Sequence, residues 1–367
     1  MRFADVLGQV APKATLIEAT RRDRLHHAYL FTGPDGVGKR RLAYAFAARL
    51  FCRAPTPDGD ACGACRDCKR VTDTHAFYEE HGVWKGTDDA PPLMPKHPDL
   101  VTLVPHGQYI RVAQIREMLR VVPFQPVEAV MRLVIIEPAD QMNDEAANAL
   151  LKTLEEPPSK TRFVLVTSLA SSLLVTIRSR CQQLAFKRLD TSSLTAIVTA
   201  RTAAAPLDPT VLANAVALAD GSARAALAIV DDPLAAAWDE LARKVLLADA
   251  RASLPGVLEV AAALAEAPSR ESLFARLARL LRDALIVRAG LAQPLLHEAL
   301  RPEISAWAAS RSVDAIIQII AILEDTRTAT RVFNVIPRLA FERLLMSIAA
   351  APGTDVATPV IQRRDIL

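Results

Sequence analysis

The sequence predicts an α/β domain built on a five-stranded parallel sheet and followed by helical domains. Five short apolar segments alternate with helical patterns in the first half of the chain, at residues 28–33, 99–104, 132–137, 162–167 and 182–186. Such alternation is typical of a mostly parallel sheet with helices on both faces. After Lys187 only helical patterns continue. We therefore expect an α/β domain over 1–188 and two helical domains, over 189–231 and 232–367.

The composition is that of an ordinary soluble globular protein. The chain has 367 residues, of which 51% are apolar and 23% are charged, with a net charge of +3. This charge is too small to predict nucleic-acid binding by itself. No apolar run approaches the roughly 18 residues of a membrane span. Residues 1–19 predict an amphipathic helix and not a signal peptide, so we expect a cytoplasmic protein without a membrane partner.

The first predicted strand leads into a glycine-rich loop, "GPDGVGKR", and then into a helix over 39–51. Backbone N–H groups in such a loop close around a phosphate, and the helix N-terminus adds a favourable dipole. We expect Gly33, Gly36 and Gly38 to shape a cradle for ATP or ADP, with Lys39 reaching its phosphates. The full motif continues with Ser or Thr, whose hydroxyl binds Mg²⁺, but Arg40 stands there.

A second departure follows the third predicted strand, in "IIEPAD". An ATPase of this kind has Asp and then Glu there, the first for Mg²⁺ and the second to activate water. Glu137 takes the first position, and Pro138, which has no acid–base chemistry, takes the second. Without a bridging metal, the charge that develops on the phosphates is not stabilised. The residues leave nucleotide binding open and predict little or no hydrolysis.

Four cysteines lie close together after the loop helix, at Cys52, Cys62, Cys65 and Cys68. The two C-x2-C spacings favour one tetrahedral ion, and four thiolates close its coordination shell. The sequence therefore predicts a structural Zn²⁺ site in residues 52–68, the cysteine module. Cys181 is remote in sequence and is expected to be a small buried hydrophobe.

The remaining patterns are helical or irregular. Residues 143–156 predict a helix with Asn143 as its N-cap, and 270–290 place Phe274, Leu277, Leu281 and Leu285 on one stripe. Such a stripe predicts packing inside a helical bundle. Residues 77–97 predict a long surface loop, and the last residues, 352–367, predict poor order.

Four motifs in order resemble the subunits of bacterial clamp loaders, a family of AAA+ proteins. They are the phosphate loop, the cysteine module, "NALLKTLEEPP" at 148–158 and "SRC" at 179–181. The resemblance covers the whole chain. It implies that the α/β domain has the AAA+ P-loop fold, that residues 189–231 are a small helical lid, and that residues 232–367 form an all-α collar joining other subunits.

The resemblance also implies roles for single residues. Arg180 matches an arginine finger that reaches the γ-phosphate of ATP on a neighbouring gamma/tau subunit, although by chemistry alone an arginine before a strand is usually a solvated charge. The four cysteines of the module match zinc ligands. Thr167 and Ser168 match the sensor-1 region, and Arg224 matches the sensor-2 arginine. The implied partners are gamma/tau and delta subunits and, through the complex, the sliding clamp and primer–template DNA.

The departures at Arg40, Glu137 and Pro138, beside an intact "SRC", favour a non-catalytic member of the family. The alternative within the family is an ATP-hydrolysing motor subunit of the gamma/tau type. A third hypothesis is a free-standing nucleotide-binding zinc protein. No basic stripe identifies residues that contact DNA.

Overall fold

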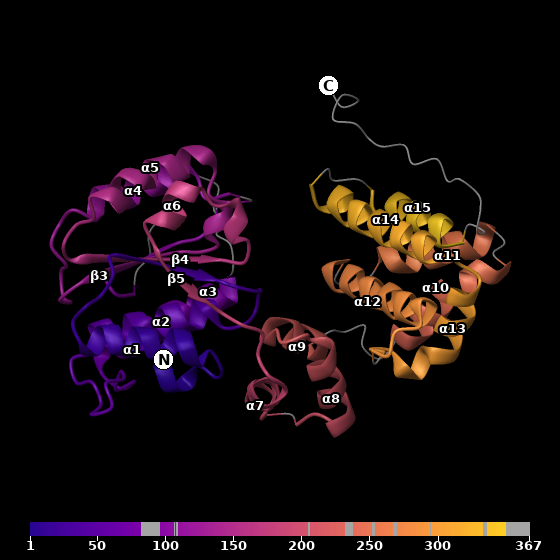
Figure 1. Ribbon diagram of the computed structural model, residues 1–367, viewed down its shortest axis with the longest axis horizontal. Helices are drawn as coiled ribbons and strands as arrows, with labels where there is room; N and C mark the ends of the chain where they lie inside the picture. The colour runs from indigo at the N-terminus through magenta and orange to yellow at the C-terminus, as the bar shows by residue number, and fades with distance from the viewer. Residues whose placement is uncertain are drawn as a thin grey trace. The chain divides into compact units, whose positions relative to one another are not determined.

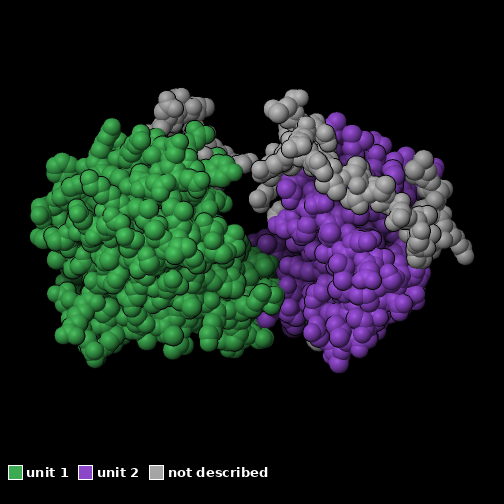
Figure 2. Space-filling model, turned by 45° about the horizontal axis from the view of Figure 1, so that its top comes forward, with its two compact units in different colours: residues 1–208, 219–226 green, residues 209–218, 227–367 purple. Residues whose placement is uncertain are grey.

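The computed structural model (Figure 1) describes residues 1–81, 96–105, 107, 109–204, 206–231, 238–251, 254–266, 270–293, 295–332 and 336–349. Two compact units divide the chain (Figure 2). The first unit comprises residues 1–208 and 219–226, and the second comprises 209–218 and 227–367. The domain borders expected at 188/189 and 231/232 remain predictions.

The first unit contains a five-stranded parallel sheet with strand order β2-β3-β4-β1-β5. Its strands are β1 (Ala28–Thr32), β2 (Leu100–Leu103), β3 (Arg132–Ile136), β4 (Thr161–Thr167) and β5 (Gln182–Ala185). All four pairings are parallel, so the carboxyl ends of all five strands share one edge of the sheet. The five predicted strands are thereby confirmed.

Helices cover both faces of this sheet (Figure 1). One face packs against α1 (Val10–Arg21), α2 (Lys39–Phe51) and α3 (Arg66–His81), and the other against α4 (Val112–Val121), α5 (Asp144–Glu155) and α6 (Val175–Ser179). Along β1 the side chains alternate between the two cores: Tyr29 and Phe31 enter the first, and Ala28 and Leu30 enter the second. Buried strands with two apolar faces explain the continuous apolar runs in the sequence.

Two expectations for local structure were wrong. The N-terminal α-helix begins only at Val10, because Gly8 and Gln9 both have positive φ, +67° and +50°, which breaks the helical path. Residues 77–81 belong to α3 and not to a loop, because Val71, His75 and Tyr78 continue the helical stripe of that element. The rest of the expected loop, 82–95, and the tail at 352–367 lie outside the described residues.

The helix α5 forms as its sequence predicts. Asn143 is the N-cap, and its side chain accepts a hydrogen bond from the Ala146 N–H. Asp144 and Glu145 occupy the first turn, where they interact favourably with the helix dipole. The helix ends at Glu155, before the pair of prolines. It therefore runs from the carboxyl-end edge of the sheet to the opposite edge.

Beyond the sheet the described elements are helical. The first unit adds α7 (Thr191–Arg201) and the first half of α9 (Ala223–Val230), as far as Ala226; the rest of α9 belongs to the second unit. The second unit contains α8 (Pro209–Leu218), α10 (Trp238–Arg251), α11 (Leu254–Ala265), α12 (Arg270–Ala289), α13 (Arg301–Ala309), α14 (Val313–Val332) and α15 (Pro337–Ala349). Short 3₁₀ turns occur at η1 (Phe3–Asp5), η2 (Ala139–Gln141), η3 (Ala170–Ser172) and η4 (Glu298–Leu300).

The apolar stripe of α12 packs inside the second unit, as predicted. Phe274, Leu277 and Leu281 are buried in its core, and Leu285 packs against that core from its edge. Among the described helices, no single one has the length and apolar composition to cross a membrane. One pair, residues 298–309 with 313–330, passes that test together but is bent by 111°.

Candidate functional site

The phosphate loop follows the carboxyl end of β1, and its glycines are required by both conformation and space. Gly36 and Gly38 have φ values of +74° and +97°, which favour glycine. A Cβ at Gly33 would lie 2.3 Å from the Phe186 carbonyl oxygen. A Cβ at Gly36 would lie 2.2 Å from the Ser222 hydroxyl. The loop therefore keeps the glycine geometry of a phosphate cradle.

Lys39 is turned onto its own loop. Its Nζ donates hydrogen bonds to the carbonyl oxygens of Gly33 at 2.7 Å and Pro34 at 2.5 Å. The residue is 6% exposed, and burial lowers the pKa of its ammonium group. In this conformation the lysine closes the loop and does not point to an external anion.

Arg40 forms an ion pair with Glu137. The Arg40 Nε lies 2.6 Å from the Glu137 Oε2, and the two side chains are 26% and 12% exposed. Burial opposes the charge on Arg40, but the carboxylate and its hydrogen bond outweigh burial and raise the pKa of the guanidinium. The two positions that would hold Mg²⁺ in an ATPase are thus joined by an internal ion pair.

Replacing Arg40 with methionine is expected to lower the free energy of unfolding by about 1–3 kcal/mol, because Glu137 loses a charged hydrogen-bond partner while mostly buried. Urea unfolding of the purified chain measures the loss. The double variant Arg40→Met/Glu137→Met removes both charges and is expected to recover part of it. The pairing would be contradicted if the single and double variants lost the same free energy of unfolding, or if the single variant lost none.

The sensor positions also have internal partners. Thr167 ends β4, and its hydroxyl donates to the Asp140 carboxylate at 2.5 Å, while Ser168 is exposed. Arg224 Nη1 lies 2.8 Å from the Asp35 Oδ2 of the phosphate loop, with both side chains 60% exposed. The structure therefore places Arg224 beside the loop, and its match to a sensor-2 arginine remains a prediction.

The N-terminus of α9 lies directly on the phosphate loop. The Ala223 N–H donates to the Gly36 carbonyl at 2.9 Å, and a Cβ at Gly36 would approach the Arg224 Cβ to 2.7 Å. This backbone contact fixes the end of the helix independently of the exposed Asp35–Arg224 pair. All of these residues belong to the first unit.

Arg180 stands at the opposite edge of the sheet. It follows α6 and precedes β5, which pairs with β1 from Tyr29–Gln182 to Thr32–Ala185. At about 3.3 Å per residue, this stretch places the loop and Arg180 more than about 10 Å apart along the strands. The guanidinium is one third exposed and lies 2.6 Å from the Glu155 Oε1. It therefore faces away from the chain's own phosphate loop.

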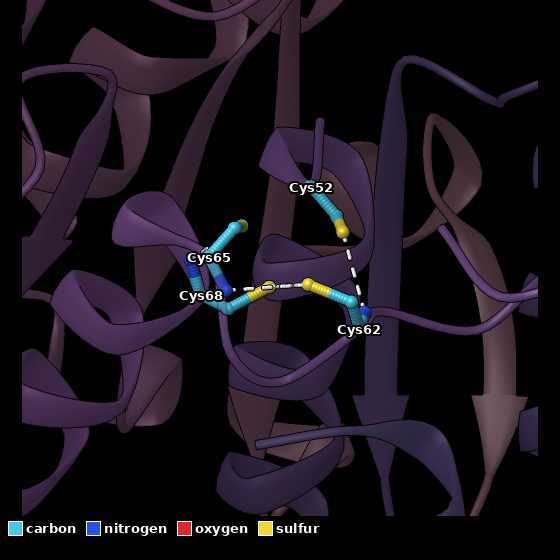
Figure 3. A group of neighbouring side chains, drawn as sticks. All are labelled: Cys52, Cys62, Cys65 and Cys68. Carbon is cyan, nitrogen blue, oxygen red and sulfur yellow. Dashed lines mark hydrogen bonds between the residues drawn. The ribbon is translucent and has the colours of Figure 1, made fainter. Parts of the chain in front are cut away.

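The four cysteines of the module converge (Figure 3). Their sulfur atoms all lie within 4.8 Å of one another. Tetrahedral Zn²⁺ with Zn–S bonds of about 2.3 Å requires sulfurs about 3.8 Å apart, so this donor set fits the metal. Backbone N–H groups of Cys62 and Cys65 point to the sulfurs of Cys52 and Cys62, both at 3.3 Å, as in a knuckle that stabilises thiolates.

The sequence did not predict how the module is attached to the fold. The Asp60 carboxylate accepts hydrogen bonds from the Phe3 and Ala4 N–H groups, both at 2.9 Å. On another side, the Arg53 Nη2 lies 3.9 Å from the Glu128 Oε2, outside the module. Charged residues flanking the cysteines were the only signal in the sequence, and their partners lie far along the chain.

Cys181 is separate from the module and 8% exposed. Burial raises the pKa of its thiol to about 12. A thiol held neutral is a poor nucleophile, so the expected structural role is confirmed.

Comparison with known proteins finds relatives among the subunits of DNA polymerase III. Residues 8–78 and 94–190 match the family model described as DNA polymerase III, delta subunit. DNA polymerase III subunit delta' of Bacillus subtilis is 38% identical over 179 residues, which cover 49% of this chain and 47% of that protein. The delta' subunit of Pseudomonas aeruginosa is 40% identical over 159 residues, or 43% of this chain and 42% of that protein.

A third relative is a tau/gamma subunit. DNA polymerase III subunit tau/gamma of Haemophilus influenzae is 33% identical over 240 residues, which cover 64% of this chain and 31% of that protein. The chain thus matches less than half the length of each of these three relatives.

Proposed function

This chain belongs to the family of bacterial DNA polymerase III clamp-loader subunits, and we propose that it is a delta'-type subunit that does not hydrolyse ATP itself. In this proposal it acts in the cytoplasm within a complex of gamma/tau and delta subunits. The complex loads the sliding clamp onto primer–template DNA. Residues 189–231 serve as the lid, and residues 232–367 join the collar.

The Arg40–Glu137 ion pair is the observation that carries this proposal. A guanidinium and its carboxylate occupy the two positions that hold Mg²⁺ in an active site of this kind. Magnesium bridging of the phosphates and activation of water are both required for rapid phosphoryl transfer. Because Pro138 also replaces the residue that activates water, two independent requirements fail at the same site.

Arg180 supplies the chemistry that this chain contributes. It stands at the edge of the sheet away from the chain's own loop, where a neighbouring subunit can present its nucleotide. There the guanidinium stabilises negative charge that develops on the γ-phosphate during hydrolysis. Arginine fingers supplied in trans accelerate comparable reactions by about 10³ to 10⁵.

The degenerate loop serves chiefly as a structural support in this proposal. Lys39 is bonded to Gly33 and Pro34, and Arg224 is paired with Asp35, so the cations of the cradle already have partners. ATP or ADP entering the loop must displace these contacts and is held without hydrolysis. Zinc, when bound by the four cysteines, supplies a closed structural centre.

One observation favours the alternative, a gamma/tau-type motor. The tau/gamma match covers 64% of this chain, whereas the Bacillus delta' match covers 49%. The longer match extends past the sheet domain, but it does not restore the lost residues at Arg40 and Pro138. Residues that perform chemistry outweigh the extent of similarity in choosing between the two.

Co-assembly tests the proposed function. Tagged full-length chain, mixed with gamma/tau and delta subunits of the same organism, is expected to co-elute with both in size-exclusion chromatography. Its addition is also expected to increase clamp loading onto primed DNA. Elution as a separate species at micromolar concentration, with clamp loading unchanged, would refute membership in the complex.

A further inference from the structure

We propose that Glu155 is a positioning residue that holds Arg180 in the orientation needed to reach a neighbour's nucleotide. Arg180 Nη2 donates to the Glu155 Oε1 at 2.6 Å, and Nη1 donates to the Thr176 carbonyl at 3.0 Å. Two different nitrogens are thus held by two different helices, α5 and α6. A guanidinium fixed at two points has one orientation, whereas one bond leaves it free to rotate.

The fold places these groups together for physical reasons. Glu155 is the last residue of α5, and Arg180 caps the C-terminus of α6, which packs against α5. Helix C-termini carry partial negative charge that favours a cation. The carboxylate adds direction to this attraction, because an ionic hydrogen bond has a preferred geometry.

The pair leaves the finger free to bind phosphate. A guanidinium has five N–H donors in a planar fork. The two bonds to Glu155 and Thr176 use one donor on each terminal nitrogen. Nη1 also lies 3.5 Å from the Ser179 Oγ, a long contact. The Nε–H and the second Nη2 hydrogen remain, so Arg180 can contact a phosphate without releasing Glu155.

Two effects of Glu155 oppose each other at the phosphate. Its negative charge reduces the attraction of Arg180 for phosphate, while its hydrogen bond orients the guanidinium. Glu155 is 48% exposed and Arg180 is 33% exposed, so water screens the charge effect strongly. Water does not weaken the second effect in the same way, because the hydrogen bond fixes the direction of the planar guanidinium. We therefore expect loss of Glu155 to slow catalysis and not to accelerate it.

This inference rests on the proposed function, because Glu155 acts through Arg180. The experiment uses the reconstituted complex with gamma/tau and delta, carrying one variant of this chain at a time, and measures MgATP turnover with clamp and primed DNA. Glu155→Ala is expected to lower kcat by about tenfold with KM for ATP within about twofold of wild type, since orientation is lost but binding is not. Glu155→Gln retains an acceptor and is expected to lose only about threefold.

Matched variants separate the possible failures. Glu156→Gln removes the same charge one residue later, at a side chain that is not among the partners of Arg180, and is expected to be neutral. In an Arg180→Ala background, Glu155→Ala is expected to add no further loss. If Arg180→Ala itself has no effect, the proposed function fails. If Arg180→Ala is strongly impaired but Glu155→Ala is normal, faster, or additive with it, the positioning role is wrong.

Discussion

Replacing Cys65 with serine is expected to remove zinc and to lower the thermal midpoint of this chain by ten degrees or more, roughly the effect of losing several kcal/mol. Structural Zn²⁺ sites bind with about 10–16 kcal/mol in zinc-finger peptides, and that binding energy is folding energy. Here the loss is smaller than that range, because the sheet and its helices have cores of their own.

Loss of zinc is also expected to destabilise the N-terminal residues, which are bound to the module by Asp60. This residue lies inside the module, and its carboxylate binds the backbone of Phe3 and Ala4. Phe3 is 2% exposed in the core against α2, so loosening the module also exposes apolar surface there. Hydrogen exchange of residues 1–8 is therefore expected to rise along with that of the module.

Metal analysis and thermal unfolding of the reduced chain measure both effects. Wild type is expected to hold about one Zn²⁺ per chain, because four thiolates close one tetrahedral shell. Cys181→Ala, a cysteine variant outside the module, is expected to keep that content. Well under one zinc per wild-type chain would refute the metal site.

Replacing Arg180 with alanine is expected to reduce MgATP turnover at the adjoining gamma/tau site by about 10³ or more. In the proposed role, the guanidinium meets charge that grows as the γ-phosphate transfers, so we expect its removal to lower kcat far more than it raises KM. The isolated chain is expected to fold normally, because Arg180 is a surface residue whose ion pair with Glu155 is partly exposed.

The reconstituted complex, assayed with clamp and primed DNA, measures this effect. Arg120→Ala is a suitable control, because Arg120 is an exposed arginine on α4 that pairs with Glu117. It removes the same side chain away from the "SRC" motif. Turnover in the Arg180 variant that equals turnover in the control would show that the finger assignment is wrong.

The strands and the helices between them were predictable, because both depend on local sequence patterns. The helix α2 begins at Lys39 and ends at Phe51, as its sequence indicated, and Asn143 caps α5. Buried parallel strands read as apolar runs, and glycine and proline mark their borders. The convergence of the four cysteines followed from their spacing alone.

The ion pairs were not predictable, because each depends on tertiary packing. Arg40 and Glu137 are 97 residues apart in the sequence. They meet only because α2 begins, and β3 ends, at the same edge of the sheet. Glu155 and Arg180 are 25 residues apart and meet where α5 and α6 end together. The sequence showed that Arg40 and Pro138 break the ATPase pattern, but not that Arg40 is neutralised within its own chain.

The most direct test of the central claim compares MgATP turnover in four samples: the chain alone and the reconstituted complex, each with Arg180 and with Arg180→Ala. A chain that acts on a neighbour's nucleotide gives no turnover alone in either form. It gives rapid turnover in the complex only when Arg180 is present. Steady turnover by the isolated chain that is stimulated by clamp and primed DNA, and that survives Arg180→Ala, would contradict the account.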